Sequence, residues 1–146
     1  MAKTYIDNYF ARYQGVKRFI DQTLIEAKQM ERTSTLLGRI RLLPDIGSSN
    51  INIRRAAERT AINTPIQGSA ADLIKLAMIN IDDAFRDRKL ISAMLLSVHD
   101  ELVFEVPSEE LDVVPPLVKK IMENIWDLKV PLKVNVAVGK NWAQAH

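Results

Sequence analysis

Three ionisable residues lie together in the second half of the chain, between two apolar stretches. His99, Asp100 and Glu101 separate residues 94–98 from residues 102–106, and both stretches have the composition of buried strands. A carboxylate held at the tip of such a hairpin is a hard oxygen ligand for a divalent metal ion. Polar residues are also common at turns for conformational reasons, so the pattern allows a metal site without requiring one.

A second set of polar residues recurs at intervals of four in the first half of the chain. Arg55, Arg59 and Asn63 share one face of an expected helix. Gln67 continues this spacing just beyond Pro65. Guanidinium and amide groups donate hydrogen bonds to phosphates and to acceptors in the DNA minor groove, which look similar for all base pairs. The alternative is an exposed amphipathic helix with no ligand.

The formal net charge of +2 does not by itself indicate nucleic-acid binding, but the charges are unevenly distributed. Residues 1–73 carry 11 Lys and Arg against 7 Asp and Glu, whereas residues 74–146 carry 9 against 11. Residues 38–59 contain five arginines and two acids, Asp45 and Glu58. Such a segment is typical of a phosphate-binding surface, although a solvated arginine-rich surface would have the same composition.

Length and composition are those of one ordinary globular domain. The chain has 146 residues, of which 47% are hydrophobic and 26% charged. No apolar run approaches the roughly 20 residues of a membrane span, and the N-terminus lacks the apolar core of a signal peptide. Because the chain has no cysteine, disulfides and thiolate metal sites are excluded. We expect a single domain over residues 1–146, cytoplasmic and with no membrane partner.

The first half of the chain is expected to be mainly helical. Apolar residues recur every three or four positions over residues 4–31, with a weak point at Gly15. Short β-like runs lie within residues 35–43, and a second helix is expected over residues 51–63. Pro65 should end that helix, because proline has no backbone N–H and clashes with the preceding turn.

Helical and strand-like patterns alternate in the second half of the chain. A helix should begin at Ser69, which has the capping-box spacing to Asp72, and should run to about Arg88. Residues 93–106 then predict a hairpin whose loop consists of the three ionisable residues 99–101.

The last part of the chain should add one helix and one strand. The helix is expected to be capped by Ser108 and to reach about Trp126, with a break at Pro115-Pro116. Residues 131–138 alternate between apolar and other side chains, which predicts a strand. The expected fold class is therefore α+β, with the hairpin and the C-terminal strand forming a small antiparallel sheet covered by helices.

Several of these segments together resemble the family A DNA polymerases of the bacterial DNA polymerase I type. Residues 54–72, ending in Pro-Ile-Gln-Gly-Ser-Ala-Ala-Asp, are similar to the segment that joins fingers and palm in that family. Val-His-Asp-Glu at residues 98–101 matches its motif C. Residues 8–10, 35–39 and 141–146 also fit, in the right order and at suitable spacing. The resemblance covers essentially the whole chain and implies a partial polymerase palm.

The resemblance implies templated nucleotidyl transfer on primer–template DNA by a two-metal mechanism, with Mg²⁺ as the cofactor. It makes Asp100 the metal-binding aspartate of motif C, with Glu101 as a second candidate and His99 near the primer terminus. The DNA-binding residues implied in the same way are Arg59, Asn63 and Gln67 along the minor groove and Arg55 at a phosphate. Residues 1–66 would derive from the fingers and residues 67–146 from the palm.

Judged by the family pattern, parts of the polymerase site are not in this sequence. We find neither motif A, with its Asp-Tyr-Ser-type strand, nor the nucleotide-binding helix with its Lys and Tyr. We therefore expect the isolated chain to be inactive in templated synthesis, with the missing polymerase half as its partner. The alternatives are a DNA-binding module without catalysis and a folded, self-associating fragment without activity.

Two further expectations concern the origin and assembly of the chain. Without its neighbouring strand the motif C hairpin would expose a sheet edge, and such edges favour homo-oligomers. The chain departs from the family pattern at Gln14, where proline is usual, and at Ser97, where glutamine is usual. These departures, several unexpected isoleucines and the Met1-Ala2 start suggest an engineered or selected autonomous fragment.

Overall fold

The computed structural model describes the backbone of residues 2–145 and the side chains of residues 4–145. Two residues named in the sequence analysis lie outside the described residues. They are Met1, in the Met1-Ala2 start, and His146, in the last segment that fits the family. The chain divides into two compact units, Met1–Ser69 and Ala70–His146. Each unit combines helices with a two-stranded antiparallel sheet, which confirms the α+β fold class.

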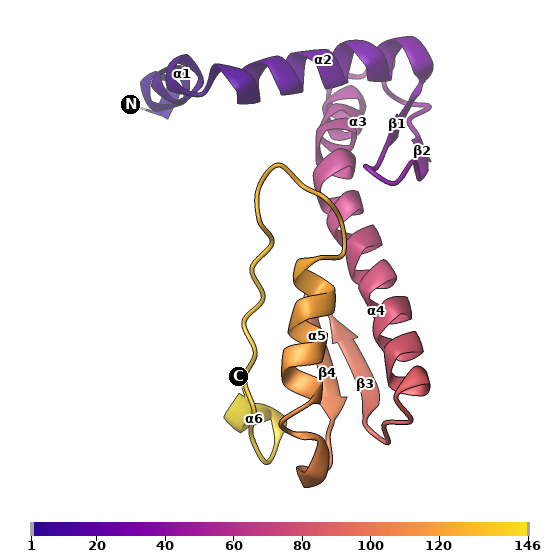
Figure 1. Ribbon diagram of the computed structural model, residues 1–146. Helices are drawn as coiled ribbons and strands as arrows, with labels where there is room; N and C mark the ends of the chain where they lie inside the picture. The colour runs from indigo at the N-terminus through magenta and orange to yellow at the C-terminus, as the bar shows by residue number, and fades with distance from the viewer. Residues whose placement is uncertain (1, 146) are drawn as a thin grey trace. The chain divides into compact units, whose positions relative to one another are not determined.

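The first unit combines helices with a short hairpin (Figure 1). Its elements are α1 (Ala2–Arg12), α2 (Gln14–Met30), β1 (Arg32–Ser34), β2 (Ile40–Leu42) and α3 (Ile51–Asn63). The predicted single helix over residues 4–31 is wrong, because Tyr13 leaves helical geometry with φ −110° and ψ 62°. The break lies two residues before Gly15, the weak point of the helical pattern. The prediction of a helix over residues 51–63 is confirmed.

The core of the first unit lies between α2, α3 and the segment that follows β2. The buried apolar side chains are Ala27, Leu43, Ile46 and Ala61, with Leu24 and Ala57 packed against them. Because Ala61 is small and completely buried, α3 can approach its neighbours closely. Lys28 Nζ and Glu58 Oε1, 3.1 Å apart, join α2 to α3 at the surface. An exposed pair of this kind contributes about 1 kcal/mol or less, so apolar burial holds the unit together.

The helical path does not end at Pro65. Thr64–Gly68 forms a π-helical turn that continues directly into α4 (Ser69–Asp87), so the predicted helix end is wrong. The predicted capping role of Ser69 is also wrong, because Ser69 lies within the continuous helix. Its hydroxyl donates to the Pro65 carbonyl oxygen at 2.5 Å and accepts from the Leu36 N–H at 2.7 Å. The end of α4 at Asp87 lies within one residue of the prediction.

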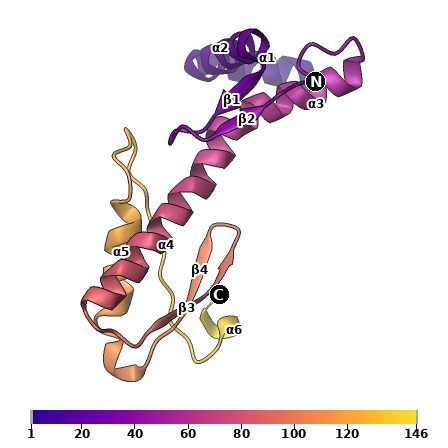
Figure 2. The same cartoon turned by 90° about the vertical axis from the view of Figure 1, so that its right-hand side faces the viewer.

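The second unit packs two helices against a hairpin (Figure 2). After α4 its elements are β3 (Ala93–Val98), β4 (Glu101–Glu105), a 3₁₀ turn (Ser108–Glu110), α5 (Val114–Glu123) and α6 (Trp142–Ala145). The buried apolar side chains are Ala77, Ile81 and Phe85 from α4 and Val114 and Val118 from α5. Phe104 of β4 lies against this cluster, with its ring centroid 5.9 Å from that of Phe85.

The α5 helix differs from the prediction at both ends. The helical break comes before the two prolines, because Ser108–Glu110 is a separate 3₁₀ turn and α5 begins at Val114. Pro115 and Pro116 occupy the first turn of α5, where the missing N–H groups have no helical partner in any case. The helix ends at Glu123, short of the predicted Trp126.

The predicted C-terminal strand is wrong. Residues 131–139 have no assigned helix or strand, and neither sheet of the described residues includes them. Leu132 and Val134 are half-buried and the Val134 N–H donates to Glu123 Oε1 at 3.0 Å. The alternating pattern is present, but a strand also needs a neighbouring strand for its backbone hydrogen bonds. The expected sheet is therefore reduced to the β3–β4 hairpin.

Candidate nucleic-acid interface and carboxylate hairpin

The predicted DNA-binding row lies on α3 and on the π-helical turn that follows it. Asn50 caps α3, because its side-chain oxygen accepts hydrogen bonds from Asn52 N at 3.0 Å and from Ile53 N at 3.5 Å. The four side chains of the row are all exposed: Arg55, Arg59, Asn63 and Gln67. The cap fixes where α3 begins and hence the direction in which the row faces.

Side-chain hydroxyls of two threonines donate to backbone carbonyls at the start of the π-helical turn. Pro65 has no N–H, so the carbonyl of Ala61, four residues earlier, loses its normal helical partner. Thr33 Oγ1 donates to this oxygen at 3.3 Å. The Thr60 carbonyl oxygen keeps its helical partner, the Thr64 N–H, and also accepts from Thr64 Oγ1 at 2.8 Å. The β1 strand therefore helps to hold the irregular turn on which Gln67 lies.

A small polar groove of about 190 Å³ brings part of the predicted row together. The groove is lined by Arg41, Thr60, Asn63, Thr64, Gln67 and Gly68. Asn63 and Gln67 thus share one site, while Arg55 and Arg59 are exposed residues outside its lining. A π-helical turn closes over five residues instead of four, so it rotates less per residue. Because of this smaller rotation, the angle about the helix axis between the Asn63 and Gln67 side chains differs from the angle in a regular α-helix.

Arg41 also lines this groove, although it is not one of the four residues predicted to bind DNA. The sequence marked it only as one arginine of the basic segment. Thr33 and Arg41 are cross-strand partners in the β1–β2 ladder, so their side chains lie on the same face of the hairpin. Because Thr33 reaches Ala61 on α3, that face is the one turned towards α3. Strand pairing, which the sequence did not reveal, was the signal needed to find Arg41.

Not every arginine of the basic segment is available to a ligand. Arg54 donates from its guanidinium to the Ser48 carbonyl oxygen at 2.9 Å, which ties α3 to the preceding loop. Arg55 and Arg59 face outward, one turn apart. The positive potential of this surface therefore rests on the exposed arginines of the segment, which are Arg39, Arg41, Arg55 and Arg59.

The carboxylate hairpin has a tighter tip than predicted. Val98 pairs with Glu101, so the turn contains only His99 and Asp100. The predicted three-residue loop is wrong, because Glu101 is already the first residue of β4 and pairs with Val98. A β-bulge between Met94 and Leu96 adds one residue to β3. Without it, the register that pairs Ala93 with Glu105 would pair Val98 with Asp100 and leave only His99 in the turn.

The residues of the tip are exposed and conformationally constrained. His99 has a positive φ of 55°, a region that histidine enters more readily than branched residues do. The side chains of His99, Asp100 and Glu101 are exposed, with Glu101 opening β4. Among the side chains of residues 4–145, no group of three or more His, Asp and Glu is placed to hold a metal ion. Asp100 and Glu101 can therefore supply part of a metal site, as hard oxygen ligands.

Glu110 anchors the opposite end of this hairpin. Its carboxylate accepts hydrogen bonds from Ser92 Oγ at 2.5 Å, Ile91 N at 2.9 Å and Ser92 N at 3.0 Å. These bonds lower the pKa of Glu110, with the Ser92 hydroxyl as the largest cause. The bonded residues directly precede β3, so Glu110 fixes where the strand starts. No pattern in the sequence indicates this contact, because the partners lie 18 and 19 residues apart.

Comparison with known proteins identifies the class to which this fold belongs. Residues 1–144 match the family model for "DNA polymerase family A". The chain therefore belongs to DNA polymerase family A. Within residues 2–145, none of the helices combines the length and apolar character that a membrane crossing needs.

Similar proteins cover this chain almost completely but are much longer. DNA polymerase I of Lactococcus lactis subsp. lactis (strain IL1403) is 50% identical over 144 residues, which are 99% of this chain and 16% of that protein. DNA polymerase I of Geobacillus stearothermophilus is also 50% identical, with the same coverage of both chains. The chain thus spans about a sixth of the length of these relatives.

A solved structure shows the same fold. The chain is similar to the POL domain of Pol1 from M. smegmatis in complex with DNA primer-template and dNTP. The TM-score is 0.95 and the sequence identity 49%, over 99% of this chain and 25% of that one. At this identity and coverage the likeness extends across both compact units of the chain.

Proposed function

We propose that this chain is the primer–template-binding and motif C part of a DNA-directed DNA polymerase. The observation that carries the proposal is the polar groove in which Asn63 and Gln67 meet, in a chain that belongs to DNA polymerase family A. The similar Pol1 structure contains DNA primer-template, which supports the same kind of ligand here. On this proposal residues 1–66 are fingers-derived and residues 67–146 palm-derived.

The DNA-binding side chains have the chemistry that this ligand requires. Asn63 and Gln67 donate from their amides to the minor-groove acceptors that all base pairs present, so contact with them does not depend on sequence. Arg59 extends this contact by one helical turn and Arg55 binds a phosphate. Arg41 adds a further cation at the groove.

The carboxylate hairpin supplies part of the catalytic site. Mg²⁺ is commonly held by one or two carboxylates together with water and substrate phosphates, which fits Asp100 with Glu101 at the exposed tip. When bound, a pair of such ions supplies activation of the primer hydroxyl and charge stabilisation at the leaving pyrophosphate. His99 lies beside the primer end. The second aspartate comes from the missing polymerase half, so the isolated chain does not catalyse synthesis.

A fluorescence-anisotropy titration with primer–template DNA tests the proposal. The titration is run with and without Mg²⁺ and at two salt concentrations, using the unmodified chain and Arg59→Ala. Binding should weaken as salt rises, because phosphate contacts release counterions, and Arg59→Ala should lower the affinity about tenfold. Arg86→Ala is the matched control, since it removes an equal charge from an exposed i,i+4 pair with Asp82.

The control separates specific contact from net charge. Equal losses in Arg59→Ala and Arg86→Ala would mean that only overall charge matters and would contradict the proposed interface. Restoration of synthesis on adding the missing polymerase half, and its loss in Asp100→Asn, would support the catalytic role. Synthesis that survives Asp100→Asn would exclude this residue as the metal-binding aspartate.

The second candidate function is a self-associating fragment without activity. The β3–β4 sheet has only two strands, and Leu95 and Leu96 are exposed on it. Open edges with exposed apolar side chains recruit further strands. Light scattering after size exclusion, over a range of concentrations, tests this, and a monomer at the highest concentration would contradict it. An engineered origin also stays a prediction, which recovery of this free polypeptide from a natural source would refute.

A further inference from the structure

The N-terminal helices carry exposed aromatic side chains that neither core uses. Tyr5, Tyr9 and Tyr13 follow one another at intervals of four residues and are 76%, 43% and 46% exposed. None of them belongs to the buried clusters of the two units. Large aromatic rings normally bury most of their surface, so a row of exposed rings marks a surface for a ligand.

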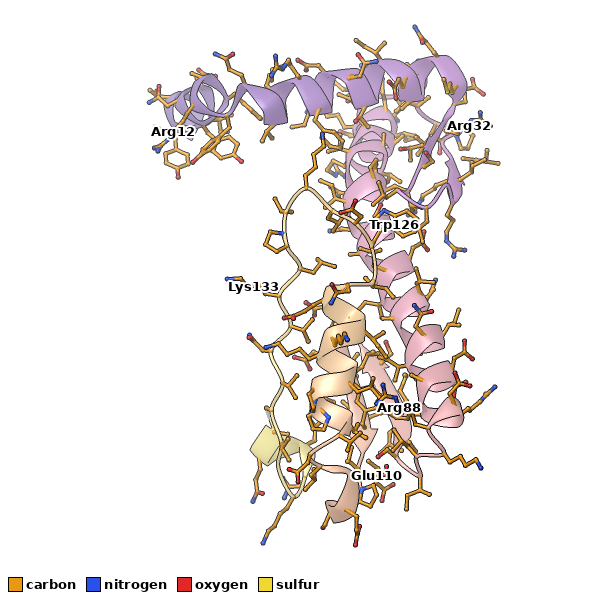
Figure 3. The ribbon with its side chains drawn as sticks, viewed as in Figure 1. Arg12, Arg32, Arg88, Glu110, Trp126 and Lys133 are labelled. Atoms are coloured by element: carbon orange, nitrogen blue, oxygen red, sulfur yellow. The ribbon has the colours of Figure 1, made fainter. Side chains whose placement is uncertain are left out.

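The rings form a connected cluster with a cation on it. The ring centroids of Tyr9 and Tyr13 are 4.9 Å apart, and those of Tyr9 and Phe10 are 5.5 Å apart. The guanidinium carbon of Arg12 lies 5.6 Å from the centroid of the Tyr13 ring. Figure 3 shows Arg12 at the α1 end of these helices, beside the ring side chains. A guanidinium at this distance from a ring makes a cation–π contact.

The charge around the cluster is positive. Residues 2–20 contain four basic residues, Lys3, Arg12, Lys17 and Arg18, and one acidic residue, Asp7. Lys17 forms an ion pair with Asp21, whereas the guanidinium of Arg12 lies on the Tyr13 ring. An anionic ligand with flat, apolar faces is therefore favoured over a purely apolar one, because it satisfies both features of the surface.

We propose that Tyr5, Tyr9, Tyr13 and Arg12 form a stacking platform for single-stranded nucleic acid. Aromatic rings beside cations are the general means of binding unpaired strands, because every base has a face that can stack. The Tyr9 and Tyr13 ring centroids are 4.9 Å apart, so the two rings are in direct contact and leave no room for a base between them. Bases therefore stack on the outer faces of the cluster, with the cations near the phosphates.

This site is separate from the polar groove on α3 and does not depend on it. The groove offers amide donors suited to base edges in a duplex, whereas the platform offers ring faces that paired bases cannot reach. The two sites can therefore be tested with different DNA ligands, and one can fail without the other.

The test compares two oligonucleotides of equal charge on the unmodified chain. Fluorescence anisotropy measures the affinity for labelled oligo(dT) of about 12 nucleotides and for an abasic strand of the same length. The platform should bind oligo(dT) about tenfold more tightly, because the abasic strand has phosphates but no bases to stack. Equal affinities would overturn the proposal, since phosphate attraction alone would then explain the binding.

Variants then show which side chains cause the preference for oligo(dT) over the abasic strand. Tyr9→Leu/Tyr13→Leu should remove the preference for oligo(dT), while Trp126→Leu, a control at an equally exposed ring, should keep it. A preference that persists in the double variant would overturn the proposal, because the bases would be recognised elsewhere. Arg59→Ala should leave the preference for oligo(dT) unchanged but weaken duplex binding, so failure of the platform and failure of the proposed polymerase interface are distinguishable.

Discussion

Substitution of Gly68 by alanine tests how the β1–β2 hairpin is held against the π-helical turn. A Cβ atom added at Gly68 would lie 2.8 Å from Thr35 Cγ2. Carbon atoms normally stay about 3.5 Å or more apart, so Thr35 would have to move by about 0.7 Å. Thr35 is buried and its hydroxyl accepts from the Arg39 N–H at 3.1 Å, which restricts that movement.

The expected magnitude follows from two opposing effects. Alanine favours a helix over glycine by about 1 kcal/mol, whereas overpacking a buried site costs about 1 to 3 kcal/mol. We therefore expect Gly68→Ala to destabilise the chain by about 1 kcal/mol. Gly15→Ala is the matched control in α2, because a Cβ there meets nothing within 4 Å. It should stabilise the chain by roughly 1 kcal/mol.

Urea denaturation followed by circular dichroism measures both variants, and a double mutant isolates the contact. Thr35→Ser removes the Cγ2 atom that meets the new methyl group but keeps the hydroxyl group. The double variant Gly68→Ala/Thr35→Ser should recover the loss, with a coupling energy of about 1 kcal/mol or more. If Gly68→Ala were as stabilising as Gly15→Ala, or if Thr35→Ser gave no recovery, the packing argument would be refuted.

Three other predictions concern the turn and the hairpin. Thr33→Val should cost about 1 to 3 kcal/mol in the free energy of unfolding, because the Ala61 carbonyl loses the donor that replaces the missing proline N–H; an unchanged urea midpoint would show that water replaces the hydroxyl. Hydrogen bonds lower the pKa of Glu110 below its ordinary value of 4.5, so its stabilising effect is present above that pH and is lost as the pH falls through the lowered value. In Glu110→Gln, the free energy of unfolding should depend less on pH in this acidic range. If the variant and the unmodified chain lost stability identically as the pH fell, the proposed stabilising role of the Glu110 carboxylate would be contradicted. His99→Val should lower the thermal midpoint by a few degrees, because a branched residue is strained at φ 55°, while His99→Asn should be neutral; equal midpoints would show that the turn relaxes.

Local patterns in the sequence were sufficient for most helices and for the family. Local spacing in the sequence predicted α3 and α4, and their ends agree with the prediction to within a residue except where the π-helical turn joins them. The hairpin around His99 and Asp100 followed from two apolar runs separated by polar residues. The family resemblance rested on contiguous motifs, and the match over residues 1–144 confirms it.

The sequence could not predict features that depend on contacts between distant residues. Pro65 removes one hydrogen bond, and the Ala61 carbonyl that loses it accepts instead from the hydroxyl of Thr33, 28 residues earlier in the chain. The β-bulge in β3 sets the register at the tip, and this register is a property of the pair of strands that neither strand determines alone. Residues 131–138 show the converse case, since their pattern is that of a strand but no partner strand is present among the described residues.

The residues of the candidate sites also fall into two groups, those that the sequence predicted and those that only the tertiary structure revealed. The residue types of Arg55, Arg59, Asn63 and Gln67 and their spacing were visible in the sequence, because a helix brings residues four apart onto one face. The tertiary structure added Arg41 to the groove through strand pairing and placed Glu110 at the base of β3. Local spacing is written in the sequence because the chain itself enforces it, whereas contacts between separate elements exist only after those elements have packed.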